Sequence, residues 1–378
     1  MKRTGFAELP LHGGRAPQWL VGRMIRLARE IVAVIIEEYG RDAFLQRVSD
    51  PYWFQALGCV LGYDWHSSGV TTVLTGVLKS ALDHGEFGLA VCGGKGKAST
   101  KAPSEIDVVA EEFGFSTEAA RRLGYASRMS AKVDNTAIQA GYPLYHHAFL
   151  VADDEKWAVI QQGMNVKDRT ARRYHWLSER VRSFVVEPHE AIVGDAKRAA
   201  VLDMTSRDSD RCRKVSVDIA KQRPSKVLNM FRSIRPVYQK SLQDWLPHQS
   251  EEGWPEPIPD FLFMPATLHW RALEKAYEFQ PTDYEELLGI RGIGPATVRG
   301  LALISELVYG EKPSWEDPVK YSFAYGGKDG VPFPVDTKAM DESICVLKEA
   351  IQDARLLEKE RLRSLRRLRS FVPRNLEI

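Results

Sequence analysis

The side chains best suited to chemistry gather in one segment, residues 145–165. It contains two adjacent histidines, His146 and His147, followed by Asp153 and, near its end, Asn165. Histidine can attack phosphorus, and lysine or asparagine can stabilise phosphoryl oxygens. Successive residues of a strand point to opposite faces, so at most one of the two histidines is expected to face a given pocket. The segment predicts a phosphoryl-transfer site, with a packed histidine and a surface histidine as the plainer alternative.

A glycine- and lysine-rich stretch, residues 92–97, is a second candidate for phosphate contacts. Its backbone amides could hold an anion. Lys95 could supply a positive charge to the histidine segment if the fold brings the two together, and Lys97 is a candidate DNA contact. The stretch is not a P-loop, because Val91 stands where the first glycine is needed and Ala98 replaces the Ser or Thr that binds magnesium. A surface loop is the alternative.

Residues 146–165 resemble the catalytic hairpin of the phospholipase D-type nucleases. The positions that match the family pattern are His146, Asp153, Gly163 and Asn165. The resemblance implies a nucleophilic histidine and a site assembled from two half-sites, sometimes through a homodimer. The sequence departs from the pattern at Ala148, where the family has lysine, and at Met164, where it has serine.

A divalent metal site is a further possibility in the same part of the chain. Asp64, His66 and Asp134, with one histidine of the pair, could bind Mg²⁺ or Mn²⁺. Such an ion would activate water and stabilise the leaving oxygen. The spacing of these residues is not that of an established metal motif.

Near the other end of the chain, residues 287–301 form the most specific pattern. Apolar residues flank Gly292, Ile293 and Gly294, and Pro295 follows directly. Glycine allows a tight turn, and proline suits the first turn of a helix. The pattern resembles a helix-hairpin-helix over residues 285–305, which implies contact with a nucleic-acid backbone. Thr297 and Arg299 are the side chains expected to assist, and an ordinary packed helical corner is the alternative.

The helix-hairpin-helix also occurs in base-excision DNA glycosylases, and the resemblance to them covers residues 287–341. It implies a catalytic aspartate at Asp336 and base flipping to expose the target. Ala296 stands near the place of the lysine that bifunctional glycosylases use, so only a monofunctional enzyme fits. The plainer interpretation makes Asp336 the N-cap of the following helix.

Two other basic segments could contact DNA. Arg172 and Arg173 precede a run of aromatic residues, and cations mixed with aromatics can clamp and stack nucleic acid. Residues 353–369 form a basic amphipathic helix with leucines on one side. Its arginines could neutralise phosphates, or the helix could simply pack by its leucines.

The composition limits the broad class. The 378 residues carry a net charge of +2, so any DNA binding depends on local basic surfaces. The four cysteines show no paired metal spacing, which favours a reduced cytoplasmic protein. No signal core and no apolar run long enough to span a membrane is present, and membrane association is not expected.

The elements that must position these residues form two main units. Residues 1–210 mix helical and strand patterns and predict an α+β or mixed α/β catalytic domain, with helices near 19–39 and 116–126. Within it, a β-hairpin is expected across residues 153–156. Residues 211–345 predict an all-α helix-hairpin-helix domain, and residues 346–378 a basic C-terminal helix and tail.

Several phrases together resemble an uncharacterised prokaryotic, largely archaeal family of unknown function. They lie at residues 4–12, 54–59, 64–69, 145–147 and 161–165. The leading hypothesis is a nuclease of DNA repair or recombination that acts on duplex, branched or single-stranded DNA. The alternatives are a monofunctional DNA glycosylase and a non-catalytic nucleic-acid adaptor.

Overall fold

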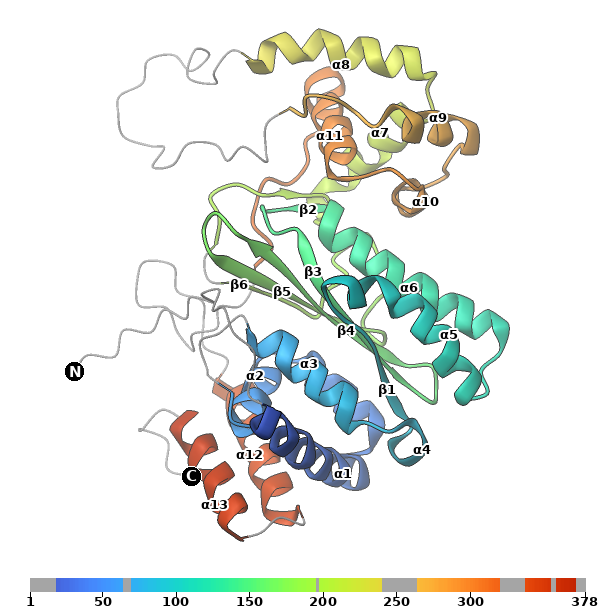
Figure 1. Cartoon of the computed structure of the whole chain (residues 1–378). Helices are drawn as coiled ribbons and strands as arrows, with labels where there is room; N and C mark the ends of the chain where they lie inside the picture. Colours follow the sequence, from blue (N-terminus) through green and yellow to red (C-terminus); the bar gives the residue numbers. More distant parts are fainter. Residues whose placement is uncertain are drawn as a thin grey trace, which may run out of the picture.

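An antiparallel five-stranded sheet lies at the centre of the structure (Figure 1). The computed structural model describes residues 18–63, 69–194, 197–239, 264–319, 337–354 and 358–371. The strands, in their order across the sheet, are β1 (Leu89–Lys95), β3 (Leu144–Ala152), β4 (Trp157–Asn165), β5 (Thr170–Leu177) and β6 (Ala191–Gly194). The predicted β-hairpin is confirmed, since β3 and β4 pair from Leu144 opposite Gly163 to Val151 opposite Trp157.

Helices cover both faces of this sheet, so its strands are buried on both sides. One face packs on α1 (Gln18–Ser49), α2 (Pro51–Val60) and α3 (Gly69–Ala81), and the other on α5 (Ala102–Glu112) and α6 (Thr117–Thr136). In the sequence between α3 and α5 lie the short α4 (His84–Phe87) and the 3-10 turn η1 (Gly96–Lys101). Along β3, Ala148 and Leu150 belong to the first core, whereas Phe149 and Val151 belong to the second.

Strand β1 is longer than the sequence predicted. Residues 92–97 were expected to form a loop, but pairing continues to Lys95, which lies opposite His146. Glycine is required at Gly93, because its φ is +90° and a Cβ there would lie 2.3 Å from the backbone oxygen of His147. The glycines thus allow β1 and β3 to approach closely. Residues 92–95 form part of a paired strand, and the interpretation of these residues as a loop is wrong.

The last two helices return to the beginning of the chain. The segments α12 (Thr337–Asp353) and α13 (Glu358–Phe371) lie beside α1 and α2 (Figure 1). Leu347, Ile351 and Leu368 are buried in the same core as these N-terminal helices. The predicted boundary at residue 346 therefore falls inside α12, and the C-terminal helices belong to the first unit by packing.

A helical unit lies at the opposite end of the molecule (Figure 1). It comprises α7 (Asp210–Ala220), α8 (Pro224–Gln239), α9 (Trp270–Phe279), α10 (Tyr284–Gly289) and α11 (Pro295–Tyr309). A small ribbon joins it to the sheet unit: β2 (Ile138–Gln139) pairs with β7 (Leu202–Asp203), and Asp203 also bridges to Ser314. The prediction that the chain mixes α and β structure is confirmed.

Helices α10 and α11 are joined by a short turn at residues 290–294, and the segment is called the α10–α11 hairpin below. Gly292 has a φ of +104°, a conformation that favours glycine, and Ile293 is fully buried. Gly294 is the N-cap residue of α11, and Pro295 occupies its first turn. No side chain caps the start of α11. The glycines and proline thus mark the turn and the start of α11, where no side chain caps the amides, and the helix-hairpin-helix itself stays a prediction.

Candidate functional site: two polar faces of one sheet

His146 and His147 lie near the same end of β3 but enter different cores. The register places Lys95 and Gln162 on either side of His146, and Gly94 and Gln161 on either side of His147. Because neighbouring side chains of a strand alternate, His146 faces α3 and His147 faces α6. The first arrangement is called the His146 face below, and the second the His147 face.

On the His146 face, the histidine ring has one bonded and one unbonded nitrogen. Its Nε2 lies 3.0 Å from Thr75 Oγ1, and the Thr75 hydroxyl itself donates to the Thr71 carbonyl at 2.8 Å. Since that proton is committed, Nε2–H donates to Thr75 and Nδ1 carries the lone pair. Nδ1 is buried and has no hydrogen-bond partner among the described residues.

His146 is neutral near pH 7. Its side chain is almost wholly buried, and burial lowers its pKa to about 3, with further lowering by His147 and Lys95. A neutral imidazole with an unprotonated Nδ1 is the nucleophilic form of histidine. Nδ1 is buried and is therefore not accessible from solvent in this structure.

Amides, hydroxyls and cations surround this histidine. The Gln162 amide accepts from the Thr71 hydroxyl and donates to the Tyr145 hydroxyl at 2.5 Å. The exposed Lys95 has its Nζ 5.9 Å from the centre of the Tyr145 ring. The fold therefore meets the condition set by the sequence: Lys95 and His146 are neighbours.

Arg173 extends the same face deeper into the protein. It is fully buried, donates from Nε to His175 Nε2 at 2.8 Å, and contacts Gln55 Oε1 at 3.3 Å. Its guanidinium carbon lies 4.5 Å from the centre of the Phe54 ring. Burial lowers the pKa of Arg173 to about 9. The His146 face thus contains two cationic side chains, Lys95 and Arg173, together with the imidazole rings of His146 and His175.

The His147 face is a closed hydrogen-bond network. His147 Nδ1 donates to Gln161 Oε1 at 2.8 Å, and its Nε2 accepts from the Ser127 hydroxyl at 2.9 Å. Burial lowers the pKa of His147 to about 4. Both ring nitrogens of His147 therefore have a hydrogen-bond partner within the core.

Asp134 anchors that network. It accepts from Gln161 Nε2 at 2.5 Å, Trp176 Nε1 at 2.9 Å and His189 Nε2 at 2.5 Å. Burial raises the pKa of Asp134, and His189 with the hydrogen bonds opposes this rise. The carboxylate therefore accepts hydrogen bonds from three donors, and its role as a metal ligand stays a prediction.

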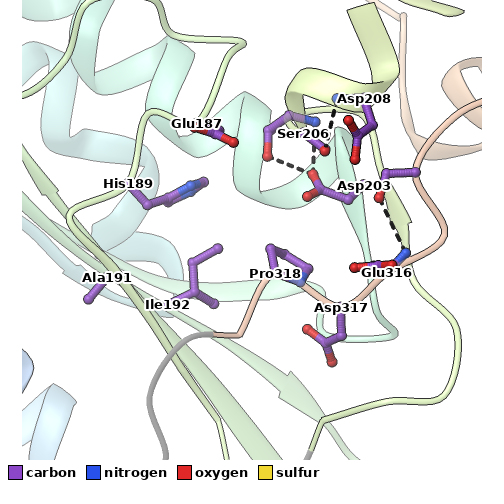
Figure 2. A pocket seen from close by; sticks show the side chains of 12 residues that line it. Glu187, His189, Ala191, Ile192, Asp203, Ser206, Asp208, Glu316, Asp317 and Pro318 are labelled. Carbon is purple, nitrogen blue, oxygen red and sulfur yellow. Dashed lines mark hydrogen bonds between the residues drawn. The ribbon is translucent and has the colours of Figure 1, made fainter. Parts of the chain in front are cut away.

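His189 connects the network to an acidic pocket of about 150 Å³, where the sheet meets the helical unit. Figure 2 shows His189 and Asp203 extending toward each other from opposite walls. The carboxylates that line the pocket are Glu187, Asp203, Asp208, Glu316 and Asp317. Across the described ranges, no three His, Cys, Asp or Glu side chains are grouped as a metal site would require. Asp64 and His66, the other predicted ligands, lie outside the described residues.

Two predicted catalytic residues lie away from His146. Asp153 is in the turn at the far end of β3, seven residues on, which is roughly 23 Å along a strand. There it pairs with Arg41 at 3.2 Å. Asn165 ends β4 and holds a turn through Asp168, with contacts of 2.9 and 3.0 Å. The His146–Asp153 arrangement implied by the phospholipase D-type resemblance is not assembled within this chain.

The predicted DNA contacts divide in the same way. Arg172 and Arg173 are fully buried in β5, and Arg172 pairs with Asp317 at 2.7 Å, so neither can contact DNA; this corrects the prediction. Thr297 is buried, and Arg299 donates to Gln139 Oε1 at 2.6 Å, which assigns both to packing. Lys97 is exposed in η1.

Sequence reasoning missed some members of both faces. Thr71, Thr75 and His189 carry no local signal, because each is a single polar residue in a separate element. Gln161 and Gln162 were noted only as polar neighbours. A pattern that could have revealed them is polar residues where buried strands and helices require apolar ones, as at 161–162 and 172–173.

Comparison with known proteins identifies the family. A family model described as "Protein of unknown function (DUF763)" matches residues 5–335, and the chain belongs to that family. No curated protein and no solved structure matches the chain. In the described part, none of the helices is long and apolar enough to cross a membrane.

Proposed function

We propose that this protein is a hydrolase of nucleic-acid phosphodiester bonds whose chemistry takes place on the His146 face. The observation that carries the proposal is the pairing of Lys95 with His146 across β1 and β3. A cation beside a neutral histidine with a free Nδ1 matches the needs of phosphoryl transfer. DNA is the substrate that we expect, in repair or recombination.

In the proposed reaction, His146 Nδ1 forms a bond to phosphorus as the bond from phosphorus to the leaving oxygen breaks, and the leaving oxygen takes a proton from solvent water. Water then cleaves the P–N bond and restores the histidine, so the net reaction is hydrolysis. Lys95 and the Gln162 amide would stabilise the phosphoryl oxygens. A bound phosphate would also raise the pKa of His146, because an adjacent negative charge favours the protonated form.

The α10–α11 hairpin would hold the nucleic-acid backbone in this scheme. The supporting features are the uncapped amides at the start of α11, since helix N-termini attract phosphate, and the exposed Arg291 beside the turn. Arg291 replaces Thr297 and Arg299 as the side chain expected to contact phosphate. The glycosylase hypothesis depends on Asp336, which lies outside the described residues.

The test is a cleavage panel of single-stranded, duplex, branched and damaged DNA, with EDTA, Mg²⁺ or Mn²⁺. Lys95→Met should lower the cleavage rate by about a hundredfold, as for loss of one positioned charge stabiliser. Lys101→Met is the matched control, because Lys101 is an exposed lysine of the adjoining η1. Wild-type rates for Lys95→Met would refute the assignment, as would cleavage lost equally in the control.

Base release from damaged DNA without strand cleavage would favour the glycosylase instead. Salt-sensitive binding with no reaction on any substrate would favour the adaptor. Both results would reject the proposed hydrolase, and the metal series reports whether Mg²⁺ or Mn²⁺ is needed.

A further inference from the structure

A basic groove lies between the first and last described helices, α1 and α13. It encloses about 350 Å³, within the range of roughly 300–1,000 Å³ typical of ligand pockets. Five arginines and two glutamates line it: Arg23, Arg26, Arg29, Arg363, Arg367, Glu30 and Glu360. The groove is thus locally basic in a chain whose net charge is only +2.

Each wall of the groove is a stripe along one helix. On α1, Trp19, Arg23 and Arg26 follow at spacings of four and three residues, and on α13 Arg363 and Arg367 are four apart. Such spacings put side chains on one helical face. The buried Leu27 and Leu61 provide an apolar floor.

The five arginines of the groove differ in their contacts with the rest of the fold. Arg29 is occupied, because it pairs with Glu86 and donates to the Ala81 carbonyl at 3.1 Å. Arg26 and Arg363 are exposed, and neither makes an ion pair with any residue that the structure describes. Arg367 is used in part by the fold, because it donates to the Val60 carbonyl at 3.2 Å. Burial lowers the pKa of Arg367, and Arg363 one helical turn away lowers it further.

The aromatic residue at the mouth of the groove points to the kind of anion. Trp19 is 63% exposed, although tryptophan is usually largely buried. The Arg23 guanidinium carbon lies 5.4 Å from the centre of its ring and helps to orient it. An exposed aromatic beside a row of cations is the arrangement by which proteins stack unpaired bases and track a phosphate backbone.

We infer that the α1–α13 groove binds single-stranded nucleic acid, with a base stacked on Trp19 and phosphates between Arg26 and Arg363. The inference rests on the proposed function for its choice of nucleic acid over other anions. It adds a contact surface at the opposite end of the molecule from the α10–α11 hairpin (Figure 1). The groove would guide the strand that is not held by the hairpin.

The experiment measures binding of a fluorescein-labelled oligothymidylate by anisotropy, in EDTA and over a series of salt concentrations. Arg26→Gln combined with Arg363→Gln should weaken binding and lower the slope of log Kd against log salt by about 1.4, or about 0.7 for each lost contact. Trp19→Ala should weaken binding at least about fivefold. All three side chains are exposed, so the variants should fold normally.

The matched control is Lys167→Gln combined with Arg182→Gln, which makes the same change in net charge at exposed loop residues outside the groove. Wild-type affinity for the groove variants, or an equal loss in the control, would overturn the inference. The inference would also be overturned if the groove variants lost binding to phosphatidylglycerol vesicles while their binding to the oligonucleotide stayed unchanged. If the groove variants bind oligonucleotide more weakly but the wild-type protein cleaves no substrate, only the proposed hydrolase is refuted. If the wild-type protein cleaves DNA but the groove variants bind oligonucleotide as tightly as the wild type, only the groove inference is refuted.

Discussion

The two faces of the central sheet use similar residues to different ends. Each has a histidine from β3 bonded to a hydroxyl and a glutamine from β4 nearby. On the His147 face, every nitrogen of the histidine has a partner and the network ends on the carboxylate of Asp134. On the His146 face, Nδ1 has no partner in the described part of the chain, and the neighbouring charged group is Lys95.

The difference separates a polar cluster whose members all pair with one another from a cluster that leaves one buried nitrogen without a partner. Buried polar groups normally satisfy one another, because an unmade hydrogen bond in the core costs about 1–3 kcal/mol. A closed network such as that of His147 recovers this cost by itself. An unpaired nitrogen beside a cation does not recover this cost. Such a nitrogen is expected where a bound ligand supplies the missing hydrogen bond.

The largest expected effect is the loss of the anchor on the His147 face. Asp134→Ala should lower the free energy of unfolding by about 3–5 kcal/mol, because three buried donors, including His189, lose their acceptor. Urea denaturation followed by circular dichroism measures this. Asp107→Ala, at an exposed aspartate of α5, is the control and should change stability by less than about 0.5 kcal/mol. Equal stability of the two variants would show that the network is not structural.

The free energy of unfolding should depend on pH through both buried histidines, His146 and His147. Their pKa values in the folded state, about 3 for His146 and about 4 for His147, lie below the unfolded value of 6.5. The unfolded chain therefore binds more protons between these limits, and stability falls as pH drops below about 6.5. His146→Gln should reduce the slope of unfolding free energy against pH by at most about 1.4 kcal/mol per pH unit. A slope no different from that of His84→Gln, at a half-exposed histidine, would contradict this.

The smallest effect is expected at Asp153. Asp153→Ala removes a surface ion pair with Arg41, so stability should fall by about 0–1 kcal/mol and cleavage should not change. Cleavage assays beside thermal denaturation check both parts. A large loss of cleavage with normal stability would restore Asp153 to the site and favour the phospholipase D-type interpretation.

Periodicity and local rules predicted much of the fold. The β-hairpin expected across residues 153–156 is present, and so is the helix expected near residues 116–126, which is α6. Ser116 is its N-cap, since its Oγ accepts from the Ala119 amide at 3.1 Å. The glycines at 292 and 294 indicated the tight turn between α10 and α11. Each of these outcomes depends on neighbours in sequence.

What failed depends on pairings distant in sequence. Arg172 and Arg173 were predicted to contact DNA because their own segment does not show that α1–α3 and α5–α6 cover both faces of the sheet. The partner of Arg172 is Asp317, 145 residues away. Likewise, the sequence could say only that Lys95 would act beside His146 if the fold brought them together, because the order of the strands decides this pairing. The return of α12 and α13 to α1 depends on packing alone.

The central claim is that His146 is chemical and His147 structural, and it is tested by comparing His146→Gln with His147→Gln for both cleavage and stability. We predict that His146→Gln folds normally and cleaves at least about a hundredfold more slowly. His147→Gln should retain cleavage and lose about 1–3 kcal/mol of stability, because its bonds to Ser127 and Gln161 are disturbed. Full cleavage by His146→Gln, or selective loss of cleavage in a stable His147→Gln, would contradict the claim.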